Sequence, residues 1–289
     1  MTDNSTRFTL NNGLEIPAIG LGVFQCSPED TVQAVQTAIA AGYRLIDTAA
    51  AYRNEEYVGE GLRQSGLAPE EVFITSKLWI SDYGYDEALR GYEVSLAKLG
   101  LEKVDLYLLH QPLTAHFERT IAAYKALARL LADGRVRAIG VSNMNEQQIE
   151  AVIEATGVVP AVNQVEVHPF FTQGALRAFH AEHGITTMAW SPIGGINRYR
   201  PQNVQQFGDS LQHPVIVDVA ARHGKTPAQV VLRWHVQNGV VAIPKSVNPG
   251  RIAENIAVFD FTLSPDEMAS IEALDTGVRG GPDPAAIGA

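Results

Sequence analysis

The segment VFITSKLWISDYGYDEALRGYEVSLAKLGLEKVDLYLLH, residues 72–110, predicts two buried strands and the helix that joins them. Its two ends, VFITSKLW and VDLYLLH, are apolar on both faces for most of their length, which is typical of parallel strands covered on both sides. Between them an apolar stripe has helical spacing and consists of Leu89, Tyr92, Leu96 and Leu99. The segment therefore predicts one strand–helix–strand unit.

This unit is repeated along the chain. Six further apolar runs alternate with helical segments: IGLGVF (19–24), RLIDTA (44–49), VRAIGVSN (136–143), AVNQVEVH (161–168), ITTMAWSP (185–192) and VVAIPKS (240–246). Eight strands that alternate with helices predict an α/β protein, a closed (β/α)8 TIM barrel with residues 1–289 as a single domain. Asn11, Asn12 and Gly13 are turn formers between two short strands, so a β-hairpin is expected before the barrel.

The alternative architecture is an open, doubly wound sheet that binds a dinucleotide. Such a sheet normally has fewer strands at this chain length, and its first strand is followed by the pattern G-x-G-x-x-G. Gly20-Leu21-Gly22 begins this pattern, but the rest of it is missing. The barrel is therefore the favoured fold.

Composition narrows the class of protein. With 46% hydrophobic and 19% charged residues the chain is expected to be globular, and a net charge of -10 argues against general binding to nucleic acids or anionic membranes. Cys26 is the single cysteine, so an intrachain disulfide is impossible. The start MTDNSTRFTL does not resemble a signal peptide, and no apolar run is long enough to cross a membrane. A cytoplasmic protein is the simplest expectation.

Polar residues lie within, at the end of, or shortly after three neighbouring predicted strands. Asp47 ends the second strand and Tyr52 follows it, Lys77 lies in the third strand, and His110 ends the fourth. Each residue alone has a structural explanation, such as a helix cap, a packing residue, an ion pair or a core histidine. Together they indicate an active site, because barrel enzymes place reactive groups at the carboxyl ends of their strands and four ionisable groups there are costly without a function.

These groups suit the reduction of a carbonyl group. A tyrosine hydroxyl has a pKa near 10 and donates a proton poorly at neutral pH, but a neighbouring ammonium group lowers that pKa. Lys77 would supply this charge, Asp47 would hold Lys77, and His110 would orient the carbonyl. The reaction also needs a source of hydride.

The motifs resemble those of the aldo-keto reductase superfamily. They are DTAAAYRNEEYVG, ITSKLW, DLYLLHQP, GRVRAIGVSN, NQVEVHP, AWSPIGG and IPKSVNPGRIAEN, they occur in the family's order, and they cover nearly the whole chain. The chain is most similar to the bacterial 2,5-diketo-D-gluconic acid reductase-like members. The resemblance implies a catalytic tetrad of Asp47, Tyr52, Lys77 and His110, with Tyr52 as general acid. It implies NADPH-dependent reduction of small aldehydes, ketones or keto-sugars to alcohols.

The same resemblance assigns the cofactor site. The residues expected to bind NADPH are Ser142, Asn143 and Gln164 at the carboxamide, Trp190 stacked on the nicotinamide, Ser191, Pro192, Ile193 and Gly194 along the pyrophosphate, Lys245, Ser246 and Arg251 around the 2′-phosphate, and Glu254 and Asn255 near the adenine. Val247 is expected to contact the cofactor as well. Physical chemistry supports the phosphate assignment, because Asn248-Pro249 opens a helix and helix N-termini attract phosphate groups. A solvated pair of cations is the alternative for Lys245 and Arg251.

The substrate site is expected to contain Phe24, Trp79, His110 and Gln111. Gln111 stands where the family often has Trp, which predicts a more polar pocket at that point. The physiological substrate, the strictness of NADPH over NADH and the oligomeric state stay open, although the family favours a monomer. The loop at residues 194–212 is expected to lie on the surface, and the tail GGPDPAAIGA either moves freely or folds over the rim of the pocket.

Three other functions are weighed against this one. A Schiff-base aldolase could use Lys77, but pairing with Asp47 would keep the amine charged. A metal hydrolase is disfavoured, and no metal is expected, because the eight histidines show no H-x-H or H-E-x-x-H spacing. A non-catalytic cofactor-binding subunit would not need all four polar residues.

Overall fold

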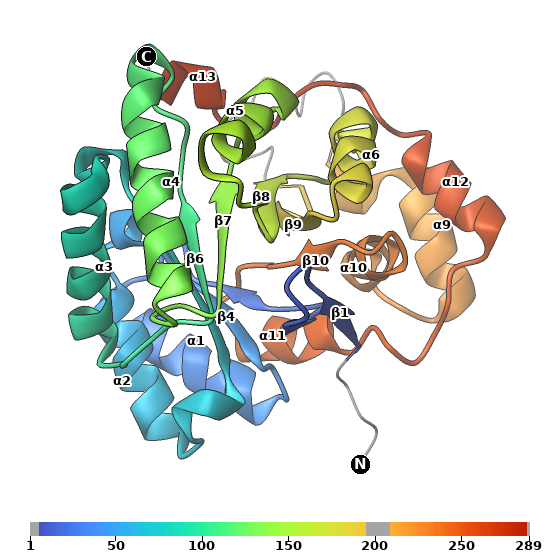
Figure 1. The fold of residues 1–289 in the computed structure, drawn as a ribbon. Coiled ribbons are helices and arrows are strands. Elements are labelled where there is room, and N and C mark those ends of the chain that lie inside the picture. The colour runs from blue at the N-terminus through green and yellow to red at the C-terminus, as the bar shows by residue number, and fades with distance from the viewer. Residues whose placement is uncertain (1–5, 195–208, 288–289) are drawn as a thin grey trace.

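Eight parallel strands curl into a barrel in the order of the sequence, in a computed structural model that describes residues 6–194 and 209–287 (Figure 1). The strands are β3 (Leu21–Gly22), β4 (Leu45–Asp47), β5 (Phe73–Leu78), β6 (Leu106–Leu109), β7 (Ala138–Ser142), β8 (Val162–Glu166), β9 (Thr186–Trp190) and β10 (Val241–Ala242). Parallel bridges from Ile19 to Ala242 and from Gly22 to Lys245 join the first and last strands. The predicted α/β barrel is confirmed.

Helices surround the barrel. They are α1 (Pro28–Ala40), α2 (Glu55–Ser65), α3 (Tyr85–Leu99), α4 (Phe117–Ala132), α5 (Glu146–Thr156), α6 (Gly174–Glu182), α9 (Pro214–His223), α10 (Pro227–Gln237), α11 (Pro249–Ile256), α12 (Pro265–Glu272) and α13 (Pro284–Ile287). Their ends follow local sequence signals. For example, the side chain of Asn145 caps α5 and that of Thr226 caps α10, each in a reciprocal box with a glutamine three residues on.

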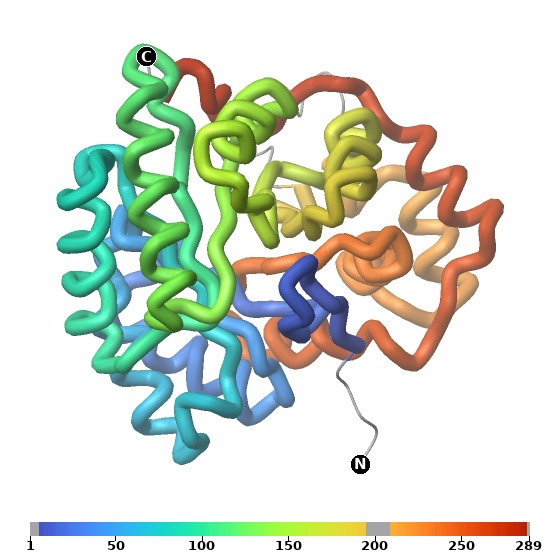
Figure 2. Tube along the Cα trace, viewed as in Figure 1, coloured from blue at the N-terminus to red at the C-terminus, as the bar shows by residue number. Residues whose placement is uncertain are grey.

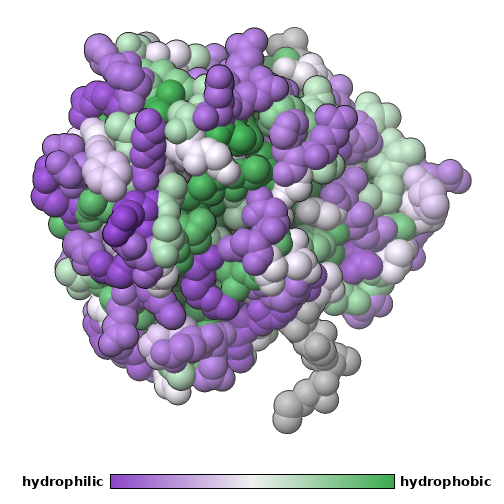
Figure 3. Space-filling view, in the orientation of Figure 1, coloured by the Kyte–Doolittle hydropathy of each residue, from purple (hydrophilic) through white to green (hydrophobic). Residues whose placement is uncertain are grey.

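Two apolar layers hold the fold together. Inside the barrel, side chains such as Leu45, Leu106, Leu108 and Met188 fill the lumen. A larger layer lies between the strands and the helices outside them. Hydrophilic side chains dominate the face in Figure 3, and hydrophobic ones gather toward its middle.

The expected N-terminal hairpin closes one end of the barrel. Its strands are β1 (Arg7–Thr9) and β2 (Glu15–Pro17). In the turn between them, Asn12 donates a hydrogen bond to the carbonyl of Arg137 at 2.8 Å, and Asn11 donates one to the carbonyl of Pro160 at 3.1 Å. Both acceptors precede barrel strands, so the hairpin lies across the amino ends of the strands and leaves their carboxyl ends free for a site.

The sequence did not decide the conformation of the loop at 194–212 or of the C-terminal tail, and the structure describes part of each segment. Within the loop at 194–212, Ser210–Gln212 forms a short 3-10 helix, η5, and residues 195–208 lie outside the described residues. The tail is folded, since Pro284–Ile287 forms α13 and both Pro282 and Ile287 line the main cavity. Figure 2 shows this last part of the chain far from the hairpin.

Neither a membrane-spanning helix nor a cluster of metal ligands is found among the described residues 6–194 and 209–287. No helix in these residues is both long and apolar enough to cross a membrane. None of their His, Cys, Asp and Glu side chains gather in a group of three or more that could hold a metal ion.

Candidate active site

A cavity of about 1050 Å³ opens at the carboxyl ends of the strands. Asp47, Tyr52 and His110 line it, and Lys77, which is fully buried, lies beneath them. The structure therefore brings the four predicted residues together. They come from the end of β4, from the loop after it, from β5 and from the residue after β6.

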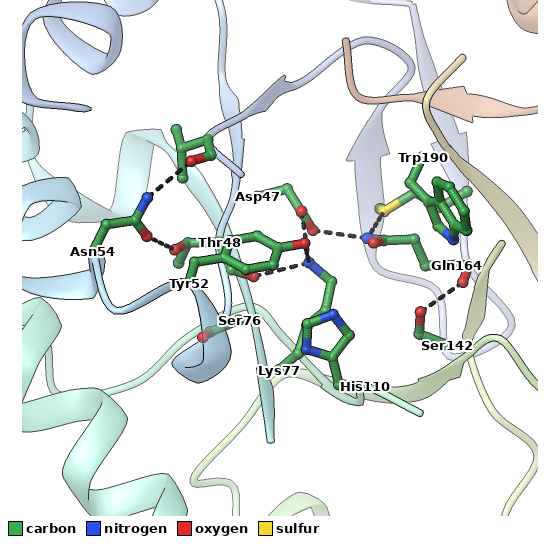
Figure 4. A network of polar contacts seen from close by, with 12 residues as sticks. Asp47, Thr48, Tyr52, Asn54, Ser76, Lys77, His110, Ser142, Gln164 and Trp190 are labelled. Atoms are coloured by element: carbon green, nitrogen blue, oxygen red, sulfur yellow. Dashed lines mark hydrogen bonds and ion pairs between the residues drawn. The ribbon is translucent and has the colours of Figure 1, made fainter. Parts of the chain in front are cut away.

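Lys77 is the centre of this group (Figure 4). Its Nζ donates to Oδ2 of Asp47 at 2.6 Å and to the carbonyl of Thr48 at 2.9 Å, and makes a longer contact of 3.4 Å to the hydroxyl of Tyr52. Asp47 and Lys77 meet because β4 and β5 are neighbouring parallel strands whose carboxyl ends lie at the same rim. Tyr52 ends the 3-10 turn η1 (Ala50–Tyr52), which returns the chain toward Lys77.

Burial and pairing oppose one another in this ion pair. Burial lowers the pKa of Lys77, and the charge of Asp47 raises it again. Burial likewise raises the pKa of Asp47, while Lys77 and the amide of Gln164, which donates to Oδ1 at 2.7 Å, lower it. A buried ammonium group remains charged only where such partners compensate for lost hydration. The pair thus places a positive charge beside the Tyr52 hydroxyl.

His110 is neutral in this setting. Burial, together with the charge of Lys77, holds the pKa of its imidazole well below the usual value of 6.5. Its ring lies edge-on to Tyr52 and to Trp79, with centroids 5.5 and 5.1 Å apart. Its Nδ1 is buried without a hydrogen-bond partner in the described residues. A neutral imidazole has one N–H, so it can donate to a carbonyl oxygen but cannot act as a cationic acid.

Amides and hydroxyls form a second cluster at the ends of β7, β8 and β9. Ser142 donates to the carbonyl of Gln164 at 2.7 Å, and Asn143 donates to Ser142 at 3.0 Å. The indole of Trp190 donates to the side-chain oxygen of Asn143 at 2.9 Å. Asn143 has a left-handed backbone with φ 61°, a conformation that asparagine tolerates better than most residues. This network fixes the orientation of the Trp190 ring at the cavity.

Residues 191–194 continue the wall of the cavity beyond Trp190. Ser191 has φ 49°, and the carbonyl of Pro192 accepts a hydrogen bond of 2.9 Å from buried His235. The backbone here is therefore held in place from below by a helix, α10.

The predicted residues after β10 divide into two groups. Lys245 lines the cavity, whereas Ser246, Val247, Arg251, Glu254 and Asn255 lie outside its lining. Asn248 caps α11 through a 3.1 Å bond to the amide of Arg251, so that helix begins beside Lys245. Glu254 accepts a 2.7 Å bond from Thr226. A helix N-terminus with two cations suits a phosphate group, so the donor set fits a phosphorylated dinucleotide.

The expected substrate residues surround the inner end of the cavity. Phe24, Trp79 and Gln111 all line it, and the Phe24 ring lies 4.9 Å from that of Tyr52. Pro282 and Ile287 reach the same cavity from the far end of the chain, so of the two alternatives that the sequence left open for the tail, the structure shows the one folded over the pocket rim. The sequence named the tail as a whole but did not single out these two residues as part of the cavity lining.

Comparisons with known proteins agree with this geometry. The profile of the Aldo/keto reductase family matches residues 18–276. The chain belongs to the aldo/keto reductase family. As an oxidoreductase of this family it fulfils the expectation from its motifs.

Individual relatives of this aldo/keto reductase span almost its full length. Morphine 6-dehydrogenase from Pseudomonas putida is 55% identical over 285 residues, which is 98% of this chain and 96% of the relative. Methylglyoxal reductase DkgA from Escherichia coli is 45% identical over 287 residues, 99% of each chain. A solved complex of Bombyx mori aldo-keto reductase with NADP has a TM-score of 0.88 at 35% identity, covering 96% of this chain and 95% of that one.

Proposed function

We propose that this aldo/keto reductase reduces the carbonyl group of small aldehydes, ketones or keto-sugars to an alcohol, with Tyr52 as general acid. The observation that carries the proposal is the 3.4 Å contact between the Tyr52 hydroxyl and the Lys77 amine, which is itself paired to Asp47 at 2.6 Å. A charge beside a phenol favours its deprotonated form. Tyr52 can therefore release its proton to a substrate oxygen at neutral pH.

The other residues orient the reactants. Neutral His110 donates a hydrogen bond to the carbonyl oxygen and so positions that oxygen near Tyr52. Trp79 and Phe24 form apolar walls on either side. Asp47 is a positioning residue for Lys77 and does not touch the substrate.

NADPH is the cofactor of this oxidoreductase and, when bound, supplies the hydride. The solved complex of a Gox0644 variant with NADPH, 44% identical and with a TM-score of 0.88, supports this assignment. We propose that Ser142, Asn143 and Gln164 hold the carboxamide and that Trp190 supports the ring. Residues 191–194 would border the pyrophosphate, and Lys245 and Arg251 would bind the 2′-phosphate, with Ser246, Val247, Glu254 and Asn255 beside them.

The size and lining of the cavity support the proposed substrate class. Aromatic residues and the polar His110 and Gln111 suit compact carbonyl compounds that also carry polar groups. The names of two relatives, a methylglyoxal reductase and a morphine 6-dehydrogenase, support a carbonyl or alcohol substrate in general. We also propose that residues 1–289 form one domain that acts as a monomer in the cytoplasm, which sedimentation velocity and cell fractionation test.

The central test is Tyr52→Phe. NADPH oxidation is followed by absorbance across a panel of carbonyl compounds, for the parent protein and for the variant. We expect turnover to fall at least about a hundredfold, the usual contribution of general acid catalysis, while the dissociation constant for NADPH changes little.

Tyr85→Phe is the matched control, because Tyr85 is 41% exposed at the start of α3. It should keep parental rates. If Tyr52→Phe also kept near-parental rates, Tyr52 would not be the proton donor.

A further inference from the structure

One buried carboxylate ties the C-terminal segment to the end of β8. Glu166 is 1% exposed, and its Oε1 accepts hydrogen bonds from the backbone N–H groups of Gly280 and Gly281, both at 2.8 Å. The same oxygen lies 3.0 Å from Nε2 of His168, and Oε2 lies 3.5 Å from the guanidinium of Arg279. The buried Glu166 carboxylate has lost its hydration. Donors from residues 279–281, the segment that it anchors, replace most of that hydration.

Arg279 is itself held from a second side. Its guanidinium lies over the ring of Phe171, 4.8 Å from the centroid. Arg279 is therefore fixed against the barrel, and Gly280 and Gly281 come directly after it in the chain.

The attached segment touches Trp190. A Cβ on Gly281 would lie 2.5 Å from Cη2 of Trp190 and 3.2 Å from Oε2 of Glu166, so the backbone runs directly against the ring edge. Trp190 is also the register partner of Glu166 between β9 and β8. Only glycine fits at this position without moving the ring or the chain.

Beyond the attachment, the segment becomes part of the cavity wall. Pro282 and Ile287 line the main cavity, and Pro284 borders a second one of about 250 Å³ together with Asn145 at the start of α5. Figure 1 shows α13 beside α5 and the start of α4. The segment reaches the site from the β8–β9 side, whereas Tyr52, Lys77 and His110 come from β4 to β6.

We propose that Glu166 is a positioning residue that fixes residues 280–287 as the outer wall of the substrate site and so sets which carbonyl compounds bind well. A three-carbon carbonyl compound held by Tyr52 and His110 does not need this wall. A larger one, such as an aromatic aldehyde, extends toward Pro282 and Ile287 and gains apolar contact there. The size preference rests on the proposed function, but the attachment of the tail does not.

The attachment is tested by hydrogen exchange of the full chain. Glu166→Gln keeps the shape of the side chain and removes its charge. We expect the amides in residues 280–287 to exchange about tenfold faster or more, because a hydrogen bond to a charged group is worth that much. Exchange in β5 and β6 should stay at the parental rate.

Glu272→Gln is the matched control. Glu272 is a carboxylate of the same C-terminal region that accepts a 2.7 Å bond from Arg177 on α6 and does not hold residues 280–287. Its loss should leave exchange in the tail unchanged. Unchanged exchange of the tail in Glu166→Gln would overturn the attachment, whatever the activity.

Steady-state kinetics test the size preference. In Glu166→Gln we expect the KM for benzaldehyde to rise several-fold, because the displaced tail no longer gives this substrate its apolar contact with Pro282 and Ile287. The KM for methylglyoxal and the kcat for both should stay within about twofold, since the proton donor is untouched. A general loss of structure would instead change both substrates alike and would contradict the proposal.

Gly281→Ala tests the same wall without touching the charge. Its added methyl group conflicts with Trp190, so the tail should be displaced and the benzaldehyde KM should again rise selectively. If Gly281→Ala and Glu166→Gln both left the ratio of the two KM values unchanged while the tail exchanged faster, the attachment would stand and the size preference would fail. Tyr52→Phe tests the general acid role in a separate experiment. Failure of that role is therefore distinguished from failure of the tail attachment and from failure of the size preference.

Discussion

At the scale of single residues, the site depends on how Lys77 keeps its charge while fully buried. Two acceptors do this, the carboxylate of Asp47 and the carbonyl of Thr48, and Gln164 in turn orients Asp47. Removing one partner of a buried ion pair costs far more than removing an exposed one, because the remaining charge is left without hydration.

Asp47→Asn is therefore expected to lower the pKa of Lys77 further, since burial already lowers it and the opposing carboxylate is lost. The ammonium form would then persist only at lower pH, so the alkaline limb of the kcat–pH profile should move to lower pH. Turnover at pH 7 should fall about tenfold or more. Rates measured from pH 5 to 9 check this, and an unmoved alkaline limb would refute it.

Asp133→Asn serves as the control for that experiment. Asp133 also pairs with a cation, Arg129 at 2.7 Å, but its side chain is 43% exposed. Exposed pairs contribute little, so its pH profile should match that of the parent.

The sequence predicted the four polar residues because Asp47 and His110 end strand runs, Tyr52 follows closely on Asp47, and Lys77 lies within an apolar run, where a charged side chain is unexpected. It could not predict the hydrogen bond from Gln164 to Asp47, nor the one from Gly280 to Glu166. The first of these pairs is 117 residues apart and the second 114. Such contacts depend on which strands become neighbours around the ring, and no local pattern of residues contains that information.

At the scale of elements, the start of α11 links the fold to the choice of cofactor. Lys245 follows β10, lines the cavity and precedes the Asn248 cap of α11. A 2′-phosphate distinguishes NADPH from NADH, and its charge would be met by this lysine and the helix N-terminus.

Lys245→Ala is accordingly expected to raise the KM for NADPH about tenfold or more and to leave the KM for NADH nearly unchanged. Lys225→Ala, which removes a lysine paired to Asp260 at 2.6 Å, should affect neither cofactor. The comparison uses initial rates with one aldehyde and both cofactors. An equal effect of Lys245→Ala on NADPH and NADH would exclude a role at the 2′-phosphate.

All eight barrel strands were located correctly from their apolar runs, but their lengths were not. The runs IGLGVF and VVAIPKS predict strands of six and seven residues, whereas β3 and β10 each have two. Ile19 and Lys245, beyond these two strands, pair only through isolated bridges, and Phe24 at the end of its run is exposed, so an apolar run does not set the length of the continuous ladder.

At the scale of the whole molecule, several buried histidines couple the fold to pH. His180 lies between Asn163 and Thr187, at 3.0 and 2.9 Å, and His235 donates to the carbonyl of Pro192. Burial lowers the pKa of His180 to about 4 and that of His235 to about 3. Both are therefore neutral in the folded protein near pH 6, while an unfolded chain binds protons there.

The sign of the effect follows from these shifts. The folded pKa values lie below the unfolded value of about 6.5, so stability should be lost as pH falls from about 6.5 toward 4. For His180 alone the loss is roughly 3 kcal/mol by pH 4. His180→Gln, which retains one donor and one acceptor, should show a weaker decline in the free energy of unfolding by urea. Parallel declines in parent and variant would rule this out.

The barrel closes where its first and last strands, β3 and β10, meet, and this closure has a consequence for synthesis in the cell. The first strand is completed by backbone bonds from Gly20 to Ala242 and from Gly22 to Pro244. A ribosome adding about 5–20 residues per second therefore needs roughly 12 to 50 seconds before the partner of that strand emerges. Throughout this interval the nascent sheet has an open edge that can pair with other chains, so translation speed and chaperone supply should govern the yield of active enzyme.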